Sequence, residues 1–115
     1  MGIGIDIVEI KRISLEDRFI DLVLSDREKE LLYKRVNKKE FLAGRFAAKE
    51  AFLKANHKGL GDIRLKDIEV LNFENGQPYI VCNNIEYLEV SISHEKEYAV
   101  AVVNLWLINL LFQLN

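Results

Sequence analysis

Apolar residues recur with a helical period through residues 41–55, and this stretch contains no proline. Two apolar stripes lie side by side on the expected helix, one with Leu42, Phe46 and Leu53 and one with Phe41, Ala48, Phe52 and Ala55. A helix that is apolar on more than one face is usually covered on several sides. The pattern therefore predicts a long central helix with Lys49, Glu50 and Lys54 placed among mostly apolar neighbours.

Alternation with a period of two predicts strands on either side of this helix. In residues 2–10, the isoleucines at 3, 5 and 7 point one way, and Gly4, Asp6 and Val8 point the other. Residues 68–73 and 78–82 flank a Glu-Asn-Gly-Gln turn, and residues 89–94 and 98–103 flank a second turn. Ser14 and Ser25 are suitable N-caps for two short helices. The expected fold class is α+β, an antiparallel sheet with a long central helix.

Size and composition favour a small single-domain protein without disulfide bonds or a transmembrane segment. The 115 residues form one predicted domain, 1–115, with an apolar tail over 105–115 that is too short for a transmembrane segment. We expect this tail to pack against the core or at a subunit contact. The net charge of −2 and the pI of about 5.7 provide no general attraction for nucleic acid. A single cysteine, Cys82, excludes an internal disulfide and a cysteine-cluster metal site, and favours a reducing, cytoplasmic setting.

Glu50 and Lys54 are the first candidates for chemistry. They are i, i+4 neighbours, and the small residues Ala43 and Ala47 flank them on the helical wheel. A carboxylate and an ammonium beside open space suit a divalent cation that carries a phosphate. The same spacing also describes an ordinary helical ion pair, worth about 0.2–0.5 kcal/mol.

Three other positions have a functional and a structural interpretation. Asp6 lies in mid-strand near two glycines, either beside a ligand or simply at an edge facing water. His94 lies where a strand gives way to a turn, and it either reaches into a site or is an ordinary turn residue. The loop at 57–61 caps the central helix and could also present backbone N–H groups to a phosphate. Basic residues at 34, 35, 38 and 39 form either a solvated loop or a surface for an acidic partner.

Taken in order, three segments resemble the 4′-phosphopantetheinyl transferase superfamily, and most closely its short, single-domain type. They are GIGIDIVEI at 2–10, RFAAKEAFLKA at 45–55 and SISH at 91–94. The segments around 67–70 and 75–80 also look like that family, so the resemblance runs from residue 2 to about residue 103. Each motif is weak alone, but the ordered set is specific.

The resemblance implies an activity. These enzymes move the 4′-phosphopantetheine arm of coenzyme A onto a serine hydroxyl of apo-acyl carrier protein, in fatty acid biosynthesis, and release adenosine 3′,5′-bisphosphate. Mg²⁺ bridges the enzyme and the coenzyme A pyrophosphate, and two carboxylates are what Mg²⁺ commonly takes from a protein. Either a metal-bound water or Glu50 is expected to accept the serine proton. The short type forms a homotrimer with each site between neighbouring subunits.

The resemblance also assigns roles to residues. It implies that Asp6 and Glu50 bind the metal and that Asp6, Glu50 and Lys54 are catalytic. Its expected coenzyme A-binding residues are Arg45, Lys49, Lys54, Lys58, Gly59, Ser93 and His94. Its expected carrier-protein-binding residues are Lys11, Arg12 and Arg18.

Two features depart from the family pattern. His57-Lys58-Gly59 stands where the family commonly has Gly-Thr-Gly, and the tail after Asn104 has no counterpart in the pattern. Two alternatives to an enzyme remain. One is a non-catalytic partner-binding module of the same α+β fold, and the other is a partner-binding α+β domain without a ligand, whose charged pairs are only structural.

Overall fold

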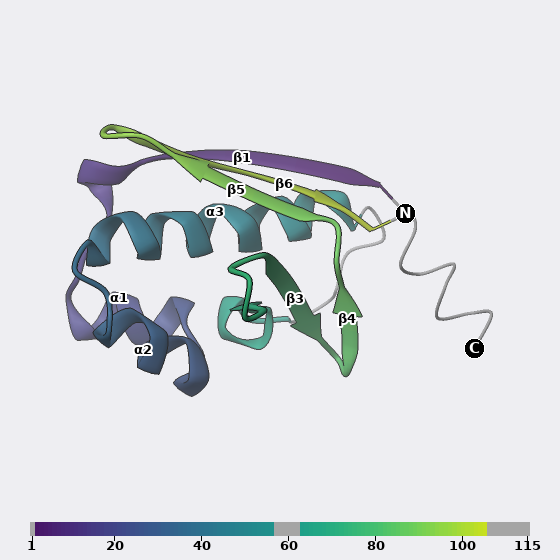
Figure 1. The fold of residues 1–115 in the computed structure, drawn as a ribbon, viewed down its shortest axis with the longest axis horizontal. Coiled ribbons are helices and arrows are strands. Elements are labelled where there is room, and N and C mark those ends of the chain that lie inside the picture. Colours follow the sequence, from purple (N-terminus) through teal and green to yellow (C-terminus); the bar gives the residue numbers. More distant parts are fainter. Residues whose placement is uncertain (1, 57–62, 106–115) are drawn as a thin grey trace.

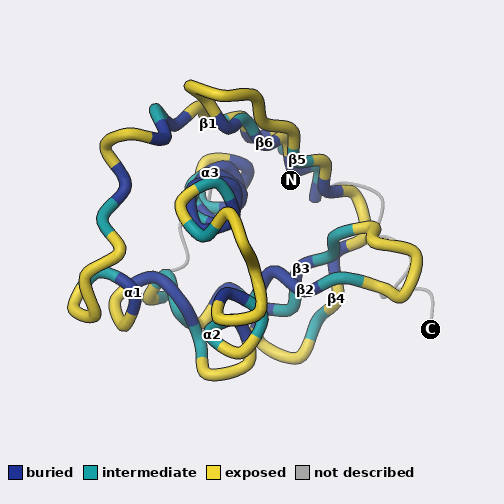
Figure 2. Tube along the Cα trace, turned by 60° about the vertical axis from the view of Figure 1, so that its left-hand side comes forward, coloured by how far each residue is buried: buried dark blue, intermediate teal, exposed yellow. Residues whose placement is uncertain are grey.

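The computed structural model describes residues 2–56 and 63–105, and its centre is helix α3 (Lys38–Ala55). This is the helix that the apolar pattern predicts. Figure 2 looks nearly along α3 and shows a largely buried helix surrounded by the other elements. Its buried residues include Leu42 from one predicted stripe, Phe52 from the other, and Ala47, which belongs to neither. The central helix is therefore the scaffold against which the rest of the chain packs.

One antiparallel sheet covers α3 on the side drawn uppermost in Figure 1. Its strand order is β1 (Ile3–Glu9), β6 (Tyr98–Asn104) and β5 (Val90–His94). Its inner face is apolar and buried, mainly through Val8 and the alternate residues Ala99, Ala101 and Val103. The β1 isoleucines lie on the outer face, between 59% and 66% exposed. The two outer strands, β1 and β5, are opposite edges of this sheet.

Most of the remaining elements lie on the other side of α3, whereas η1 directly follows β1 at the end of the first sheet (Figure 1). A second antiparallel sheet contains, in order, β2 (Glu69–Asn72), β3 (Pro78–Cys82) and β4 (Ile85–Tyr87). The helical elements are η1 (Ile10–Arg12), α1 (Asp17–Val23), α2 (Asp26–Tyr33) and η2 (Leu65–Asp67). The α+β class with antiparallel sheets on a long helix is as the sequence predicts. Among the described residues, no helix is both long and apolar enough to cross a membrane.

Two local predictions differ in outcome. Ser25 caps α2 in a capping box with Glu28, as its sequence position predicts. The prediction that Ser14 caps the first helix is wrong, because α1 begins at Asp17 and the Ser14 hydroxyl accepts a bond from the Glu16 amide instead, at 3.1 Å. Strand β4 has no counterpart among the predicted strands. It follows a tight turn at Asn83 and Asn84, both of which have positive φ.

Gly4 sets the distance between β1 and α3. A Cβ atom at this position would lie 1.8 Å from the carbonyl oxygen of Ala51 and 2.8 Å from the amide nitrogen of Ala55. No other residue type fits there without moving the strand, since real Cβ atoms do not approach backbone so closely. The close approach brings Asp6, two residues along β1, to the part of α3 that contains Glu50 and Lys54.

Cys82 is buried and free, as expected of a small apolar side chain. At the end of the described chain, Leu105 is buried and its amide donates to the Gly2 carbonyl at 3.0 Å. The rest of the apolar tail, residues 106–115, lies outside the described residues. The expectation that it packs at a subunit contact stays a prediction.

Candidate active site

Strand β1 and helix α3 bring Asp6 and Lys54 together. The Lys54 ammonium donates to Asp6 Oδ1 at 2.9 Å and to the Ile5 carbonyl at 3.0 Å. The Asp6 side chain is largely covered, with 17% exposed, whereas that of Lys54 is 56% exposed. The sequence spacing pairs Lys54 with Glu50 on the same helix, but the described ion pair is the one to Asp6. The lysine therefore joins the strand to the helix.

Glu50 lies beside this pair and is half-buried. Burial raises the pKa of its carboxyl, the negative charge of Asp6 raises it further, and the Lys54 ammonium acts in the opposite direction. The influence of Asp6 shows that the two carboxylates are within electrostatic reach of each other. Two carboxylates that repel each other, with an exposed lysine paired to one of them, form a site that gains from binding a cation.

The donor set fits Mg²⁺ better than a metal held entirely by protein. No group of three or more potential metal-ligating side chains occurs in the part of the chain that the structure describes. Mg²⁺ is usually bound by one or two carboxylates, with water and substrate phosphates completing the octahedron. Asp6 and Glu50 provide two carboxylates, so they fit a cation that arrives with a phosphate group.

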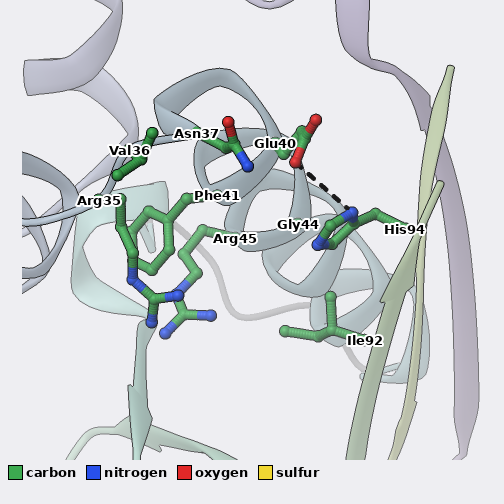
Figure 3. Close-up of a pocket in the computed structure, with 9 residues that line it drawn as sticks. All are labelled: Arg35, Val36, Asn37, Glu40, Phe41, Gly44, Arg45, Ile92 and His94. Atoms are coloured by element: carbon green, nitrogen blue, oxygen red, sulfur yellow. Dashed lines mark ion pairs between the residues drawn. The ribbon is translucent and has the colours of Figure 1, made fainter. Parts of the chain in front are cut away.

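A separate cavity of about 310 Å³ lies along the first half of α3 (Figure 3). On one side, Ile92 and His94 reach it from β5. On the other side, two guanidinium groups, Arg35 and Arg45, lie against the ring of Phe41, with their central carbons 4.6 Å and 4.2 Å from the ring centroid.

The cavity also contains an acid opposite its arginines. Glu40 Oε2 lies 3.9 Å from His94 Nδ1, an ion pair when the histidine is protonated. His94 and Arg45, which the resemblance assigns to coenzyme A, thus line the same cavity.

Arg45 is unusual for an arginine because it is only 6% exposed. Burial, assisted by the neighbouring charge of Arg35, lowers the pKa of its guanidinium to about 10, and the charge of Glu28 opposes this lowering. Its Nη2 donates to Asn72 Oδ1, but its buried Nε has no hydrogen-bond partner among the described residues. A buried donor of a charged group without a partner is costly. The cavity therefore suits an anion that accepts from Arg45.

Lys49 does not belong to a coenzyme A site in this structure. Its side chain has no exposed area, and its ammonium donates to Glu28 Oε1 at 2.6 Å and to the carbonyls of Val23 and Leu65. Glu28 is equally buried and also accepts from the Val70 amide at 2.9 Å. The expectation that Lys49 contacts coenzyme A is corrected on this ground. Burial lowers the pKa of Lys49, and the Glu28 carboxylate opposes that effect.

The other predicted coenzyme A residues separate into two groups. Ser93 is exposed and, by strand alternation, points to the opposite face of β5 from Ile92 and His94, so it does not line this cavity. Lys58 and Gly59 lie outside the described residues. Their proposed contact with phosphate stays a prediction.

The predicted carrier-protein residues Lys11, Arg12 and Arg18 are all exposed. Lys11 and Arg12 lie on η1, each 81% exposed in its side chain, and both contact Glu9, at 3.4 Å and 2.9 Å. Arg18 is exposed on α1. Their charge remains accessible to an acidic partner.

Sequence reasoning missed Arg35 and Phe41 of the cavity, and also Asn72, which bonds Arg45 without lining the cavity. Arg35 appeared only as part of a basic cluster, and Phe41 only as an apolar position of the helix. Asn72 carried no signal, because an asparagine before a hairpin turn is common turn chemistry. What could have indicated Phe41 and Arg45 is their i, i+4 spacing, which places a guanidinium over a ring on one helix face.

Comparison with known proteins identifies the family as the phosphopantetheinyl transferases. A sequence model described as the 4′-phosphopantetheinyl transferase superfamily matches residues 2–103. A holo-[acyl-carrier-protein] synthase of Geobacillus sp. (strain WCH70) is 45% identical over 111 residues, which cover 90% of this chain and 93% of the relative. The chain belongs to the 4′-phosphopantetheinyl transferase superfamily and, within it, to the holo-[acyl-carrier-protein] synthases.

Solved structures show the same fold. A holo-(acyl-carrier-protein) synthase from Bacillus anthracis str. Ames, in complex with CoA (3′,5′-ADP), matches with a TM-score of 0.78 and 43% identity, covering 89% of this chain and 92% of that one. The Helicobacter pylori synthase in complex with coenzyme A matches with a TM-score of 0.77 and 36% identity, covering 89% and 97%. The predicted family, enzyme class and fold class are thereby confirmed.

Proposed function

We propose that this chain transfers the 4′-phosphopantetheine arm of coenzyme A to a serine hydroxyl of apo-acyl carrier protein and releases adenosine 3′,5′-bisphosphate. The supporting observation is the group of Asp6, Glu50 and Lys54 between β1 and α3, in a chain that belongs to this family of transferases. The reaction serves fatty acid biosynthesis, in the reducing cytoplasmic setting that a single free cysteine favours.

In the proposed complex, Asp6 and Glu50 hold Mg²⁺, and Lys54 binds the pyrophosphate of coenzyme A. When bound, the cation neutralises charge on the pyrophosphate and stabilises the leaving group. Lys54 is placed to help because its Nζ already reaches the Asp6 carboxylate and its side chain is more than half exposed. Phosphoryl transfer depends mainly on positioning and charge stabilisation, and these three residues provide both.

Glu50 is also a candidate acceptor for the serine proton. Its pKa is raised, first by burial and then by Asp6. Without a bound cation this makes Glu50 a stronger base than an ordinary glutamate, whereas Mg²⁺ on the carboxylate would act in the opposite direction, so a metal-bound water is the alternative acceptor. Its position beside the proposed pyrophosphate site brings it near the phosphorus that the serine oxygen attacks.

The arginine-lined cavity is proposed to take the adenosine end of coenzyme A. That end carries the 3′-phosphate, an anion separate from the pyrophosphate. Arg45 brings a guanidinium group to the cavity wall, and Arg35 adds a second positive charge beside it. A phosphate between two guanidinium groups is a strong charge-assisted interaction.

The two sites face different directions on one chain. Arg45 and Glu50 are five residues apart, which places them about 140° apart around the axis of α3. The site of Asp6, Glu50 and Lys54 lies at the β1 edge of the upper sheet, whereas His94 lies at the β5 edge of the same sheet. We propose that the β1 edge of one subunit meets the β5 edge of the next, so that three copies close a ring. The exposed isoleucines of β1 supply an apolar surface for such a homotrimer.

Mixing two inactive variants tests the shared site. Asp6→Asn removes the carboxylate half, and Arg45→Ala removes the cavity half. If each site uses Asp6 from one subunit and Arg45 from its neighbour, randomly re-associated equal mixtures should regain about a quarter of wild-type activity, because one interface in four is intact. Transfer activity after co-refolding is the measurement. No recovery beyond the two separate variants would show that one chain provides both halves.

Charge reversal at Arg12 tests the docking surface for the acidic carrier protein. Arg12→Glu should raise the KM for apo-acyl carrier protein by about tenfold, since it replaces an attractive charge with a repulsive one at an exposed site. The KM for coenzyme A should stay near the wild-type value. Steady-state kinetics with each substrate varied in turn separates the two constants, and an equal rise in both would contradict the assignment.

Mass spectrometry tests the activity itself and the alternative, a non-catalytic module. The protein is incubated with coenzyme A, Mg²⁺ and apo-acyl carrier protein. The carrier protein should gain the mass of one 4′-phosphopantetheine arm, and omission of Mg²⁺ should prevent the gain. An unchanged mass, with a relative from the same family active under the same conditions, would favour the non-catalytic module.

A further inference from the structure

Asn72 is the one hydrogen-bond partner that the described residues give to the Arg45 guanidinium. It is the last residue of β2, and its Oδ1 accepts from Arg45 Nη2. The guanidinium also lies over the ring of Phe41, with its central carbon 4.2 Å from the ring centroid. These two contacts fix the plane of the guanidinium. Its Nε is left without a partner, although it is buried.

The side-chain amide of Asn72 makes a second hydrogen bond, on the side away from Arg45. Its Nδ2 donates to the carbonyl of Gly76 at 2.9 Å, across the hairpin turn. This bond decides which way the amide points, because only the nitrogen can face a carbonyl and only the oxygen can face an arginine. Gly76 has a φ of +92°, which favours glycine at this place in the turn. The turn therefore orients the amide, and the amide orients the guanidinium.

The side chain of Asn72 is neutral, and this affects how much positive charge Arg45 keeps for a ligand. A carboxylate there would also accept from Arg45, but it would neutralise the positive charge that attracts an anion. It would lose the donor to Gly76 and place a negative charge against that carbonyl. An amide fixes the arginine and leaves its charge for a ligand. Arg35, whose guanidinium lies over the same Phe41 ring, adds to that charge.

We infer that Asn72 is a positioning residue that aims Arg45 at the 3′-phosphate of coenzyme A while leaving its charge uncompensated. The inference rests on the proposed function, because it takes the cavity of Figure 3 as the nucleotide end of the coenzyme A site. Asn72 acts through Arg45 and does not line the cavity itself. Its effect should therefore appear in recognition of the 3′-phosphate rather than in transfer chemistry.

The test measures how strongly the protein distinguishes adenosine 3′,5′-bisphosphate from adenosine 5′-monophosphate by calorimetric titration. The ratio of the two dissociation constants isolates the 3′-phosphate. Asn72→Asp should reduce this ratio by about tenfold or more, as expected for loss of a charge-assisted phosphate contact. Asn72→Ala should reduce it about two- to tenfold, because the arginine must then be immobilised on binding. In transfer assays, both variants should raise the KM for coenzyme A more than they change kcat.

Asn75→Asp is the matched control. It adds the same charge in the same hairpin, at an exposed residue whose Oδ1 accepts from the Gln77 amide and can still do so as a carboxylate. This variant should keep the wild-type ratio. Thermal unfolding of all three variants checks that each is folded at the titration temperature.

The results of this test distinguish the role of Asn72 from the assignment of the cavity to coenzyme A. If the wild type prefers the bisphosphate and both Asn72 variants keep its ratio, the role of Asn72 is overturned and the proposed function stands. If Asn75→Asp lowers the ratio as much as Asn72→Asp, a general charge effect replaces the positioning role. If the wild type does not distinguish the two nucleotides, the assignment of the cavity fails, and the inference fails with it.

Discussion

Replacing Glu50 by glutamine should reduce phosphopantetheine transfer to the background rate, and Asp6→Asn should do the same. Each change removes one of the two carboxylates proposed to hold Mg²⁺, and an uncharged amide is a much weaker ligand for this cation. Loss of one electrostatic contact in a transfer site costs about 10²–10³ in kcat. Loss of the cation that depends on it should cost more. The measurement is the initial rate of carrier-protein modification at saturating coenzyme A and Mg²⁺.

Stability measured on the same variant serves as the control. The pKa of Glu50 is raised from an ordinary value of 4.5 by burial, with Asp6 adding to the effect. The charged carboxylate therefore opposes folding above that ordinary pKa, whereas below it the group is protonated in both states and has no effect. Without metal, Glu50→Gln should equal the wild type at low pH and become the more stable protein as the pH rises through the raised pKa. A folded Glu50→Gln variant that transfers the arm at the wild-type rate would contradict the site.

Breaking the buried pair of Lys49 and Glu28 should produce the largest loss of stability. Lys49→Met should lower the free energy of unfolding by about 3–5 kcal/mol, because Glu28 would remain as a buried carboxylate without its cation. Two carbonyls, those of Val23 and Leu65, would lose their donor as well. Chemical denaturation at neutral pH is the measurement.

Two further variants serve as comparisons for the stability loss of Lys49→Met. Lys54→Met removes an ammonium from the same helix, but one whose side chain is 56% exposed, and should cost only about 0–1 kcal/mol. The double change Glu28→Gln with Lys49→Met removes both charges and should recover part of the lost stability. If Lys49→Met costs no more than Lys54→Met, the buried pair does not contribute as the structure indicates.

The parts of the fold that follow from local patterns are predictable from the sequence. The apolar stripes of α3 predict a covered helix, the Asn75-Gly76 turn predicts the β2–β3 hairpin, and Ser25 predicts the start of α2. Each of these signals depends on neighbouring residues only. The meeting of Asp6 with Lys54 is not of this kind, since the residues are far apart in the chain. The ordered motifs of the family predicted that Asp6 and Lys54 share one site, but not the ion pair between them.

The errors arise where long-range packing decides. Lys49 lies one residue before Glu50, and its sequence context suits a phosphate ligand equally well. The structure shows that Lys49 is buried against Glu28 of α2. The periodicity of the sequence does not predict this contact, because the two residues lie on different helices. The exposed side of β1 is a similar case, because alternation separates its isoleucines from Asp6 without indicating which face packs on α3. Gly4 decides this, through its close approach to Ala51.

The central claim is that Asp6 and Glu50 hold one cation together with the pyrophosphate of coenzyme A. The most direct measurement is a titration with Mn²⁺, as a paramagnetic substitute for Mg²⁺, followed by electron paramagnetic resonance with and without coenzyme A. Wild type should bind the ion much more tightly when coenzyme A is present, and Asp6→Asn and Glu50→Gln should each lose this enhancement. Equal enhancement in the wild type and in both variants would contradict the claim.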